Sequence, residues 1–172
     1  MKKIFETKRL YIKSVATEDA PFILELMNTP KWIEFIGDRN VTTEKGAEAY
    51  IQEKALPQFE KFGYGNNVIF LKENHKKIGT CGVYHREGKS EPDIGFAFLP
   101  NFEGKGYAFE ANTELIKYMR NVHELTELSA YTLEENLRSR KLLERLGFKL
   151  IGVGTLPPTN EELLHYHRLL DV

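Results

Sequence analysis

The chain has 172 residues, 41% hydrophobic and 28% charged, which fits one globular domain over residues 1–172 better than two small ones. With 24 basic against 25 acidic residues the net charge is -1, and no segment approaches the ~18 to 20 apolar residues that span a bilayer, so neither nucleic acid nor a membrane is an expected partner. Cys81 is the only cysteine, which excludes an intrachain disulfide and favours a reducing compartment, the cytoplasm.

The chain begins with a predicted strand and a predicted helix. Residues 9–15, "RLYIKSV", place Leu10 and Ile12 at alternate positions, which is typical of a strand. Apolar side chains then recur at helical spacing through "PFILELM", and Thr17 precedes them as a candidate N-cap. We therefore expect a strand followed at once by a helix over residues 17–28.

A second helix, a hairpin and a further strand are predicted next. Residues 43–62 carry a second helical pattern, which Pro57 would bend or end because it lacks a backbone N–H. Residues 66–73 and 76–87 are rich in Val, Ile, Phe and Tyr and flank the turn-like "ENHK", which indicates a hairpin. Residues 92–100, with proline at both ends, predict another strand.

The last part of the chain alternates helices and strands. The apolar face of a long amphipathic helix is predicted from Ala108, Ala111, Leu115, Ile116, Met119 and Val122. "LTELSAYTL" predicts a strand, and "NLRSRKLLERLGF" predicts a helix with Asn136 as N-cap and Gly147 as its left-handed terminator. "FKLIGVG" and "ELLHYHRLL" predict two final strands. Strands separated by helices and closed by a hairpin indicate an α/β or α+β sheet rather than a helical bundle.

The stretch "NFEGKGYAFEA", residues 101–111, places a glycine loop directly before a helix. Unpaired backbone N–H groups gather there at the positive end of the helix dipole, and such a place attracts phosphate. Gly104 and Gly106 would let the backbone approach an anion closely, while Lys105 would add charge or point to solvent. No P-loop pattern is present, and Phe109 stands where a dinucleotide fingerprint needs its third glycine. A tight connection without a ligand stays the alternative for a bare Gly-x-Gly.

Together with its neighbours, this loop resembles the GCN5-related N-acetyltransferase (GNAT) family. The family's pyrophosphate-binding signature, Gln/Arg-x-x-Gly-x-Gly/Ala, maps onto residues 103–108, with Glu103 in place of the usual Gln or Arg. "RLYIKSVATEDAPFILELMN", "DIGFAFLP" and "NLRSRKLLERLGF" resemble the opening strand and helix, the fourth strand and the late helix. "IGF", "GKGYAFEA" and "N-x-x-S" followed by "LGF" are most similar to the RimJ/RimL branch, which acetylates protein N-termini among other amines. The resemblance covers nearly the whole chain.

The resemblance implies a single-domain fold with a mixed, mostly antiparallel sheet flanked by helices, and acetyl-CoA as the acetyl donor. Strands four and five, around residues 92–99 and 125–132, would splay apart to admit the cofactor. Backbone groups of Phe96, Ala97 and Phe98 would pair with the pantetheine arm, and one N–H would polarise the thioester carbonyl. The pyrophosphate would be held by amides of Gly104, Lys105, Gly106, Tyr107, Ala108 and Phe109. Glu103 would turn away from it and weaken binding modestly at most.

By the same resemblance, the proton donor for the departing thiolate would come from the late helix. Asn136 would hydrogen-bond the cofactor arm, and Ser139 would contact or protonate the sulfur. The tyrosine that many family members use as this donor is absent, because Leu143 stands at its position. Without the family context, Asn136 would be a plain N-cap and Ser139 an exposed helical serine.

The base and the acceptor site are less closely defined. An α-amine with a pKa of about 8 is already partly neutral at physiological pH and needs no more than water-relayed deprotonation. Asp93 is the candidate catalytic base, and Glu91, Glu34 and His85 flank the same expected cleft, where each would otherwise be a solvated surface group. Trp32, Glu34 and His85 are the candidate acceptor-binding residues.

Some residues tempt other interpretations. His165 and His167 share one face of a predicted strand, but two ligands do not make a metal site, so no metal is expected. Cys81 would be an acyl-enzyme nucleophile only if it were accessible, and a small buried thiol is the commoner outcome. "RSRK", residues 138–141, would either meet the 3′-phosphate of CoA or form a solvated face.

The leading hypothesis is an acetyl-CoA-dependent N-acetyltransferase that moves an acetyl group directly to a primary amine, such as a protein N-terminal α-amine. The alternatives are an acetyltransferase for a small amine, such as a polyamine or an aminoglycoside, and a non-catalytic acyl-CoA-binding sensor. A dinucleotide-binding oxidoreductase is disfavoured by Phe109. The sequence leaves open the acceptor, the base, the use of longer acyl donors, and whether the protein is a monomer or a homodimer.

Overall fold

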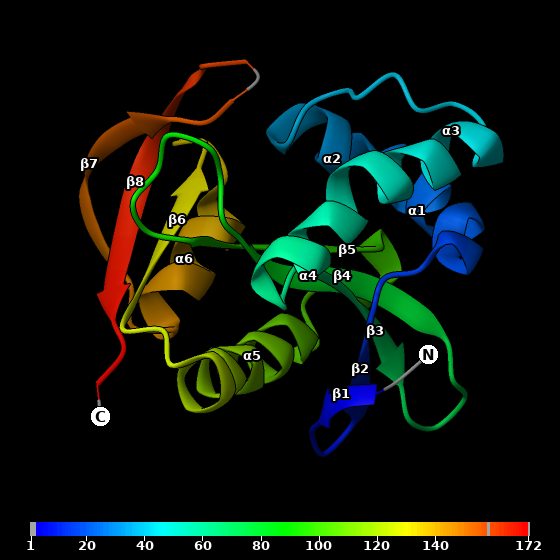
Figure 1. The fold of residues 1–172 in the computed structure, drawn as a ribbon, viewed down its shortest axis with the longest axis horizontal. Coiled ribbons are helices and arrows are strands. Elements are labelled where there is room, and N and C mark those ends of the chain that lie inside the picture. The colour runs from blue at the N-terminus through cyan, green and yellow to red at the C-terminus, as the bar shows by residue number, and fades with distance from the viewer. Residues whose placement is uncertain (1–2, 158, 172) are drawn as a thin grey trace.

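A single eight-stranded sheet forms the centre of the protein, in a computed structural model that describes residues 3–157 and 159–171 (Figure 1). The strands are β1 Lys3–Glu6, β2 Leu10–Ser14, β3 Asn66–Leu71, β4 Lys77–Tyr84, β5 Asp93–Phe98, β6 Glu127–Thr132, β7 Lys149–Thr155 and β8 Glu162–Leu169. Their order in the sheet is β1-β2-β3-β4-β5-β6-β8-β7. All neighbours are antiparallel except β5 and β6, which are parallel. The predicted fold class, a mixed and mostly antiparallel sheet with helices, is confirmed.

The first strand, β1, was not predicted from the sequence. Its four residues pair with β2 and are exposed or half-buried, so they lack the run of apolar residues that marks a strand. Its presence shifts the count by one, because the strands expected as four and five are β5 and β6. The predicted hairpin is confirmed as β3 and β4, and the closing pair of strands as β7 and β8.

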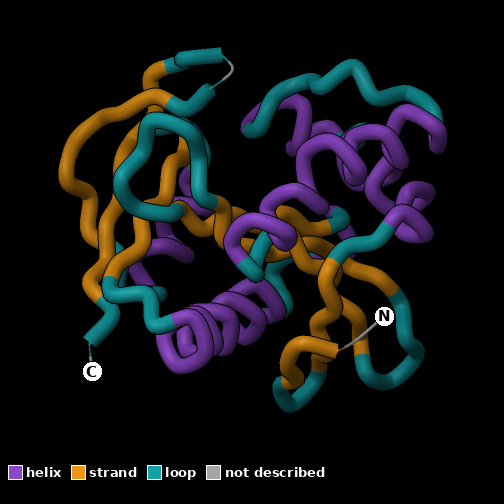
Figure 2. Tube along the Cα trace, in the orientation of Figure 1, coloured by secondary structure: helices purple, strands orange, loops and turns teal. Residues whose placement is uncertain are grey.

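Helices cover both faces of the sheet. They are η1 Thr17–Asp19, α1 Ala20–Met27, α2 Pro30–Phe35, α3 Glu44–Tyr50, η2 Ile51–Ala55, α4 Leu56–Phe62, η3 Pro100–Phe102, α5 Tyr107–His123 and α6 Leu137–Arg145. Figures 1 and 2 show α1 to α4 grouped apart from α5 and α6. The buried side chains accordingly form two clusters, one around α5 and α6 and the other around α1 and α3.

Three details of the predicted helices were wrong or incomplete. Thr17 is not the N-cap of the first helix, because a 3-10 turn begins there and the Asp19 carboxylate accepts a hydrogen bond from the backbone N–H of Ala16 at 2.9 Å. Pro57 does not end the second helix. A five-residue π turn, η2, leads into α4, and Pro57 lies in the first turn of α4, where its missing N–H costs little.

Val122 does not belong to the buried face of α5, since its side chain is 56% exposed. The next residue, His123, takes the inward position in the last turn. Its ring packs against Tyr64 and Tyr118, with ring centroids 5.1 Å and 5.4 Å apart. The other predicted apolar positions of this helix, from Ala111 to Met119, are buried.

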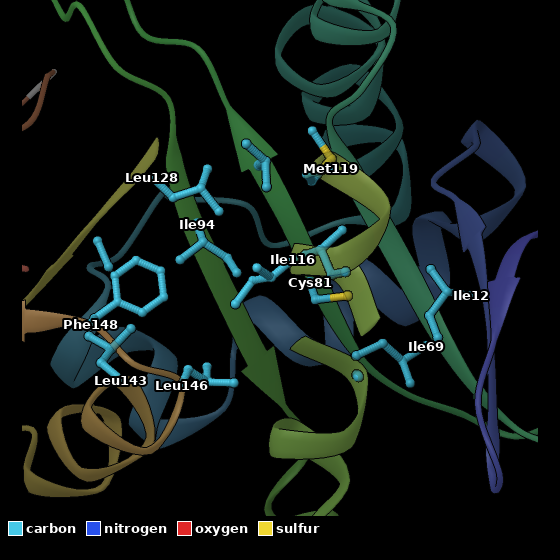
Figure 3. Packing of buried hydrophobic residues seen from close by; sticks show 14 of the residues in the cluster. Ile12, Ile69, Cys81, Ile94, Ile116, Met119, Leu128, Leu143, Leu146 and Phe148 are labelled. Carbon is cyan, nitrogen blue, oxygen red and sulfur yellow. The ribbon is translucent and has the colours of Figure 1, made fainter. Parts of the chain in front are cut away.

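The core under α5 and α6 fixes the geometry of β5 and β6. Figure 3 shows Ile94 of β5 beside Leu128 of β6, with the Phe148 ring between them and Leu143 of α6, and all four are almost completely buried. Because side chains alternate along a strand, Ile94 and Leu128 turn their sequence neighbours, Asp93 and Ser129, to the opposite face, where α1 to α4 lie. Asp93 and Ser129 themselves form a register pair, which among the described residues is the only pair that joins β5 to β6.

Candidate active site

The strands β5 and β6 diverge immediately after the one register pair that joins them. The Ser129 N–H donates to the Pro92 carbonyl at 2.9 Å. In the part of the chain that the structure describes, Asp93 and Ser129 are the only paired positions between these strands, whereas β5 pairs with β4 along its whole length. The predicted splaying of these two strands is therefore confirmed. One edge of β5 beyond this bridge has no strand partner among the described residues.

The backbone of β5 presents two residues to this opening. The Leu99 N–H donates to the Ile78 carbonyl of β4 at 2.9 Å. Backbone groups alternate in direction along a strand, so Ala97 also faces β4, opposite Thr80, while Phe96 and Phe98 direct their N–H and C=O groups into the opening. Of the three residues predicted to pair with a pantetheine arm, Phe96 and Phe98 are placed to do so through their backbones, and Ala97 is not.

The glycine loop lies at the wide end of the opening. Gly104 and Gly106 have φ angles of +73° and +82°, a left-handed conformation that side chains disfavour. Gly106 is the N-cap of α5 and offers no side-chain cap. The first intrahelical bond runs from the Glu110 N–H to the Gly106 carbonyl, which leaves the N–H groups of residues 107–109 without helical acceptors. The free N–H groups of the loop, at the start of a 17-residue helix, therefore have the arrangement that binds an anion.

Arg9 holds the glycine loop in place, and this contact was not predicted from the sequence. Its guanidinium donates to the Lys105 carbonyl at 3.0 Å and lies 4.3 Å from the ring centre of Tyr107. The same guanidinium donates to the Glu110 carboxylate at 2.7 Å, which also accepts from the Thr7 hydroxyl at 2.7 Å. Burial would raise the pKa of Glu110, but these hydrogen bonds outweigh it and hold the pKa below its usual value.

Glu103, the departure from the family signature, is enclosed by positive charge. Its side chain is 15% exposed and forms ion pairs with Lys31 of α2 and, at 3.5 Å, with Arg138 of α6. The loop before α5 is therefore tied to helices on both sides of the opening. Arg138, whose alternatives were phosphate contact and a solvated face, lies beside the glycine loop with its Nη1 atom 3.7 Å from where a Cβ on Gly104 would stand.

Asn136 and Ser139 lie at the start of α6, on the other side of the opening. The Asn136 side chain accepts a hydrogen bond from the Ser139 N–H at 3.3 Å, so Asn136 is an N-cap as predicted. Ser139 is half-buried, and its hydroxyl has no hydrogen-bond partner among the described residues. Leu143, at the position of the family tyrosine, is 1% exposed and part of the core.

Asp93, the candidate base, lies at the closed end of the opening. Both carboxylate oxygens accept hydrogen bonds from Arg86, at 2.8 Å and 3.1 Å, and the side chain is 4% exposed. Burial raises the pKa of Asp93, and the Arg86 guanidinium opposes that rise. The paired geometry leaves Asp93 well suited to fixing the start of β5 beside Ser129.

The candidate acceptor residues fall into two groups. Trp32 and Glu34 lie on α2, near the glycine loop, because their neighbour Lys31 reaches Glu103. The Trp32 indole N–H is buried and has no hydrogen-bond partner among the described residues. His85 lies at the other end of β5, beyond the Tyr84 and Asp93 pair, with its ring 4.6 Å from that of Phe62.

The closed end also holds a cavity of about 320 Å³. Its lining residues are Tyr64, His85, Ser90, Glu91, Pro92, Glu124, Leu125, Thr126 and Glu127. His85 and Glu91, two of the acid–base candidates, therefore line one cavity, and Trp32 and Glu34 are not part of it.

The remaining candidates have clear structural settings. Cys81 is completely buried, and burial raises the pKa of its thiol to about 12, so the interpretation of Cys81 as a buried thiol is confirmed. His165 and His167 bind different partners: the Nε2 atom of His165 is 2.8 Å from the Ser129 hydroxyl, and that of His167 is 3.0 Å from the Glu127 carboxylate. The contact between His165 and Ser129 had no signal in the sequence, because it joins β6 to β8.

No helix in the described ranges is long and apolar enough to cross a membrane.

Comparisons with known proteins agree with this geometry. Residues 9–149 match the acetyltransferase (GNAT) domain family. The uncharacterized N-acetyltransferase YnaD of Bacillus subtilis is 27% identical over 157 residues, which cover 90% of this chain and 89% of that protein. The [ribosomal protein uS5]-alanine N-acetyltransferase of Escherichia coli is 37% identical over 59 residues, 34% of this chain and 30% of that protein.

Among solved structures, RimL, a ribosomal L7/L12 α-N-protein acetyltransferase in complex with coenzyme A, has the same fold. The TM-score is 0.84 at 16% identity, with 99% of each chain covered. The family match covers most of the chain, and the splayed strands and the glycine loop agree with it. The chain belongs to the GNAT family of acetyltransferases.

Proposed function

We propose that this protein, as one domain over residues 1–172, transfers an acetyl group from acetyl-CoA directly to a primary amine, and that the amine is a protein N-terminal α-amine of the RimJ/RimL kind. One observation carries the proposal. The unpaired backbone edge of β5 leads straight to a left-handed glycine loop at the start of α5, so a thioester arm and a pyrophosphate have adjoining places in one opening.

The residues around the opening fit the parts of acetyl-CoA. Phe96 and Phe98 would bond a pantetheine arm through their backbones, as an added strand. The amides of residues 104–109 would hold the pyrophosphate. Lys105 and Arg138 would add positive charge close by, and Arg9 would hold the loop in shape through the Lys105 carbonyl.

The reaction requires a group that polarises the thioester carbonyl and a donor that gives a proton to the departing sulfur. The Phe96 N–H, the first free donor beyond the bridge between β5 and β6, would polarise the thioester carbonyl. Ser139, with its unengaged hydroxyl, would supply a proton to the departing sulfur. In the net reaction a C–N bond forms, the C–S bond breaks, and one proton passes from the amine nitrogen to the thiol.

The proposed acceptor class follows from relatives and from amine chemistry. The Escherichia coli relative is named for an alanine of ribosomal protein uS5, and RimL is named as an α-N-protein acetyltransferase of ribosomal L7/L12. An α-amine with a pKa of about 8 has a useful neutral fraction at physiological pH, whereas a lysine side chain with a pKa of about 10 has little. A weak base in the protein then suffices.

The test is release of free thiol from acetyl-CoA with a panel of acceptors. The panel contains short peptides with different first residues, polyamines and aminoglycosides, and mass spectrometry locates the acetyl group. We expect turnover with peptides and acetylation of their α-amines. Turnover with polyamines or aminoglycosides alone would replace the acceptor class and keep the reaction. Acetyl-CoA binding with no turnover would favour a sensor, and no binding at all would overturn the role of the glycine loop.

A further inference from the structure

Three side chains from different segments meet at the closed end of the opening. The Ser129 hydroxyl of β6 lies 2.8 Å from Nε2 of His165 in β8 and donates to the Glu91 carboxylate at 3.1 Å. Glu91 belongs to the loop between β4 and β5, which passes across β6 and β8 in Figure 1. The Tyr131 ring stacks on the His165 ring, with centroids 4.5 Å apart and planes 18° from parallel.

This cluster lies where an acceptor amine would enter. Ser129 forms the bridge at which β5 and β6 begin to diverge, so it marks the closed end of the opening. Ser129 and Tyr131 alternate with Leu128 and Ala130, which are buried against the core under α5 and α6. They therefore face the side of α1 to α4, opposite the helices that carry the glycine loop and Ser139.

The hydrogen bonds determine which nitrogen of His165 can accept a proton. Hydrogen bonds from Ser90 and Ser129 hold the pKa of Glu91 below its usual value, so the carboxylate is ionised near neutral pH and only accepts. The one Ser129 proton then goes to Glu91, and Nε2 of His165 must carry a proton and donate to the Ser129 oxygen. Nδ1 is left as the acceptor, and no described residue donates a hydrogen bond to it.

We propose that His165 accepts the proton of the incoming ammonium, and that Ser129 and Glu91 position its ring and stabilise its charged form. The proposal rests on the proposed acetyltransferase function and names a base that the reaction lacked. Asp93 is less suited to this role, because both of its oxygens accept from Arg86. His165 has one free nitrogen and a side chain that is 17% exposed.

The proton transfer balances without another reactant. One N–H bond of the ammonium breaks as an Nδ1–H bond forms, and the amine nitrogen keeps the electron pair with which it attacks the thioester carbonyl carbon. The imidazolium is stabilised through Ser129 by the Glu91 carboxylate, much as the aspartate of a Ser-His-Asp triad stabilises the imidazolium that it orients. Its proton afterwards leaves to solvent, and the imidazole is regenerated.

The charges around His165 set the direction of its titration. Burial lowers the pKa of His165, the Glu91 carboxylate opposes this, and His167 on the same strand and Lys89 on the Glu91 loop lower the pKa further. The remaining neighbours, Ser129 and Tyr131, are uncharged near neutral pH. The imidazole is therefore neutral at physiological pH and able to accept a proton.

The experiment measures kcat/KM against pH, by thiol release with the best peptide acceptor, for wild type, His165→Gln and the matched control His167→Gln. His167 lies two positions away on the same strand face and pairs with Glu127 instead. We expect His165→Gln to lose the acidic limb that belongs to the enzyme and about 10²-fold of activity, with partial rescue of His165→Gly by added imidazole. His167→Gln should keep the activity and the limb, with the limb moved slightly to higher pH because His167 lowers the His165 pKa.

Glu91→Gln provides a second readout. Without the carboxylate the imidazolium is less stable, so the His165 pKa falls further, which an NMR titration of the ring shows without any turnover. An acidic limb unchanged in His165→Gln, or removed instead by Asp93→Asn, would overturn the proposal. A His165 titration that Glu91→Gln does not move would also overturn it. Wild-type protein without turnover on any amine would mark failure of the proposed function itself.

Discussion

The two sides of the opening are built very differently. On the cofactor side, α5 has 17 residues, five of them buried, and its loop is fixed by Arg9 and Glu110. On the acceptor side, α2 has six residues, none of them buried, and it touches the loop through the ion pair between the exposed Lys31 and Glu103. The rigid side would bind the part of acetyl-CoA that never changes, and the thinly anchored side would meet the acceptor. Acceptor choice can thus vary with little cost to the fold.

The largest effect that separates catalysis from binding should come from Ser139→Ala. Ser139 is on α6, which covers the same face of the sheet as α5, but its hydroxyl would act only when the thiolate departs. We expect kcat to fall about 10²-fold, while the Kd for acetyl-CoA, measured by calorimetry, stays within about twofold. An equal loss in kcat and in acetyl-CoA affinity would instead make Ser139 a binding residue.

Gly106→Ala should damage the cofactor side selectively. A side chain at a φ of +82° costs about 1 to 3 kcal/mol unless the loop shifts, and a shift displaces the amides that face the pyrophosphate. We expect the Kd for acetyl-CoA to rise about 10-fold. The matched control is Gly88→Ala, which has a φ of +80° and open space around it, and which should lower thermal stability without changing that Kd.

Trp32 allows the acceptor side to be tested alone. Trp32→Phe keeps a six-membered ring on the cluster around α1 and α3 but removes the pyrrole part of the indole and with it the buried N–H, which has no hydrogen-bond partner among the described residues. If this N–H bonds the acceptor, KM for the amine should rise about 2- to 10-fold with an unchanged Kd for acetyl-CoA. Identical KM values for wild type and Trp32→Phe, with a higher KM for Trp32→Ala, would reduce the role of Trp32 to packing.

The Glu110 anchor predicts an acid-sensitive loop. Its folded pKa lies below the usual glutamate value, so the stabilisation is complete above that usual value and is lost as pH falls through the folded pKa. Glu110→Gln should therefore lower Tm at neutral pH, and the difference from wild type should shrink in acid. Thermal scans from about pH 7 to about pH 3 check this, and a constant difference across that range would contradict it.

The smallest effect is expected where the two sides touch. In Glu103→Gln the loop loses a negative charge near the pyrophosphate site, but Lys31 and Arg138 already neutralise that charge. We expect acetyl-CoA to bind no more than about threefold more tightly, with less difference at high salt. Weaker binding of acetyl-CoA by this variant would show that Glu103 orders the loop through its two partners.

Most of the fold followed from local patterns, because each of the longer elements carries its own periodicity and end signals. The strands from β2 to β8 and the helices α1, α5 and α6 are close to their predicted ranges. The features that were not predicted correctly are short or polar. The four residues of β1 lack a pattern. Asp19, not Thr17, is the N-cap residue of α1, and its carboxylate accepts from the Ala16 N–H of the preceding 3-10 turn.

The same distinction between local patterns and distant contacts applies to the site. The glycine loop and Asn136 with Ser139 are contiguous motifs, so their positions could be predicted. Arg9 and Glu110 are 101 residues apart, and Glu91, Ser129 and His165 come from three segments that only the sheet order brings together. Sequence spacing carries no signal for such contacts, and His165 was considered only as a metal ligand.

The unpaired edge of β5 also bears on how the protein avoids aggregation. Free N–H and C=O groups on a strand edge are the usual template on which a foreign strand is added. Here the edge lies inside the sheet, facing β6, and the bridge between Asp93 and Ser129 closes one end. An intruding polypeptide would have to separate two strands of one sheet to reach it. Hydrogen-bonding capacity can therefore stay available to a slender thioester arm while it stays out of reach of a neighbouring chain.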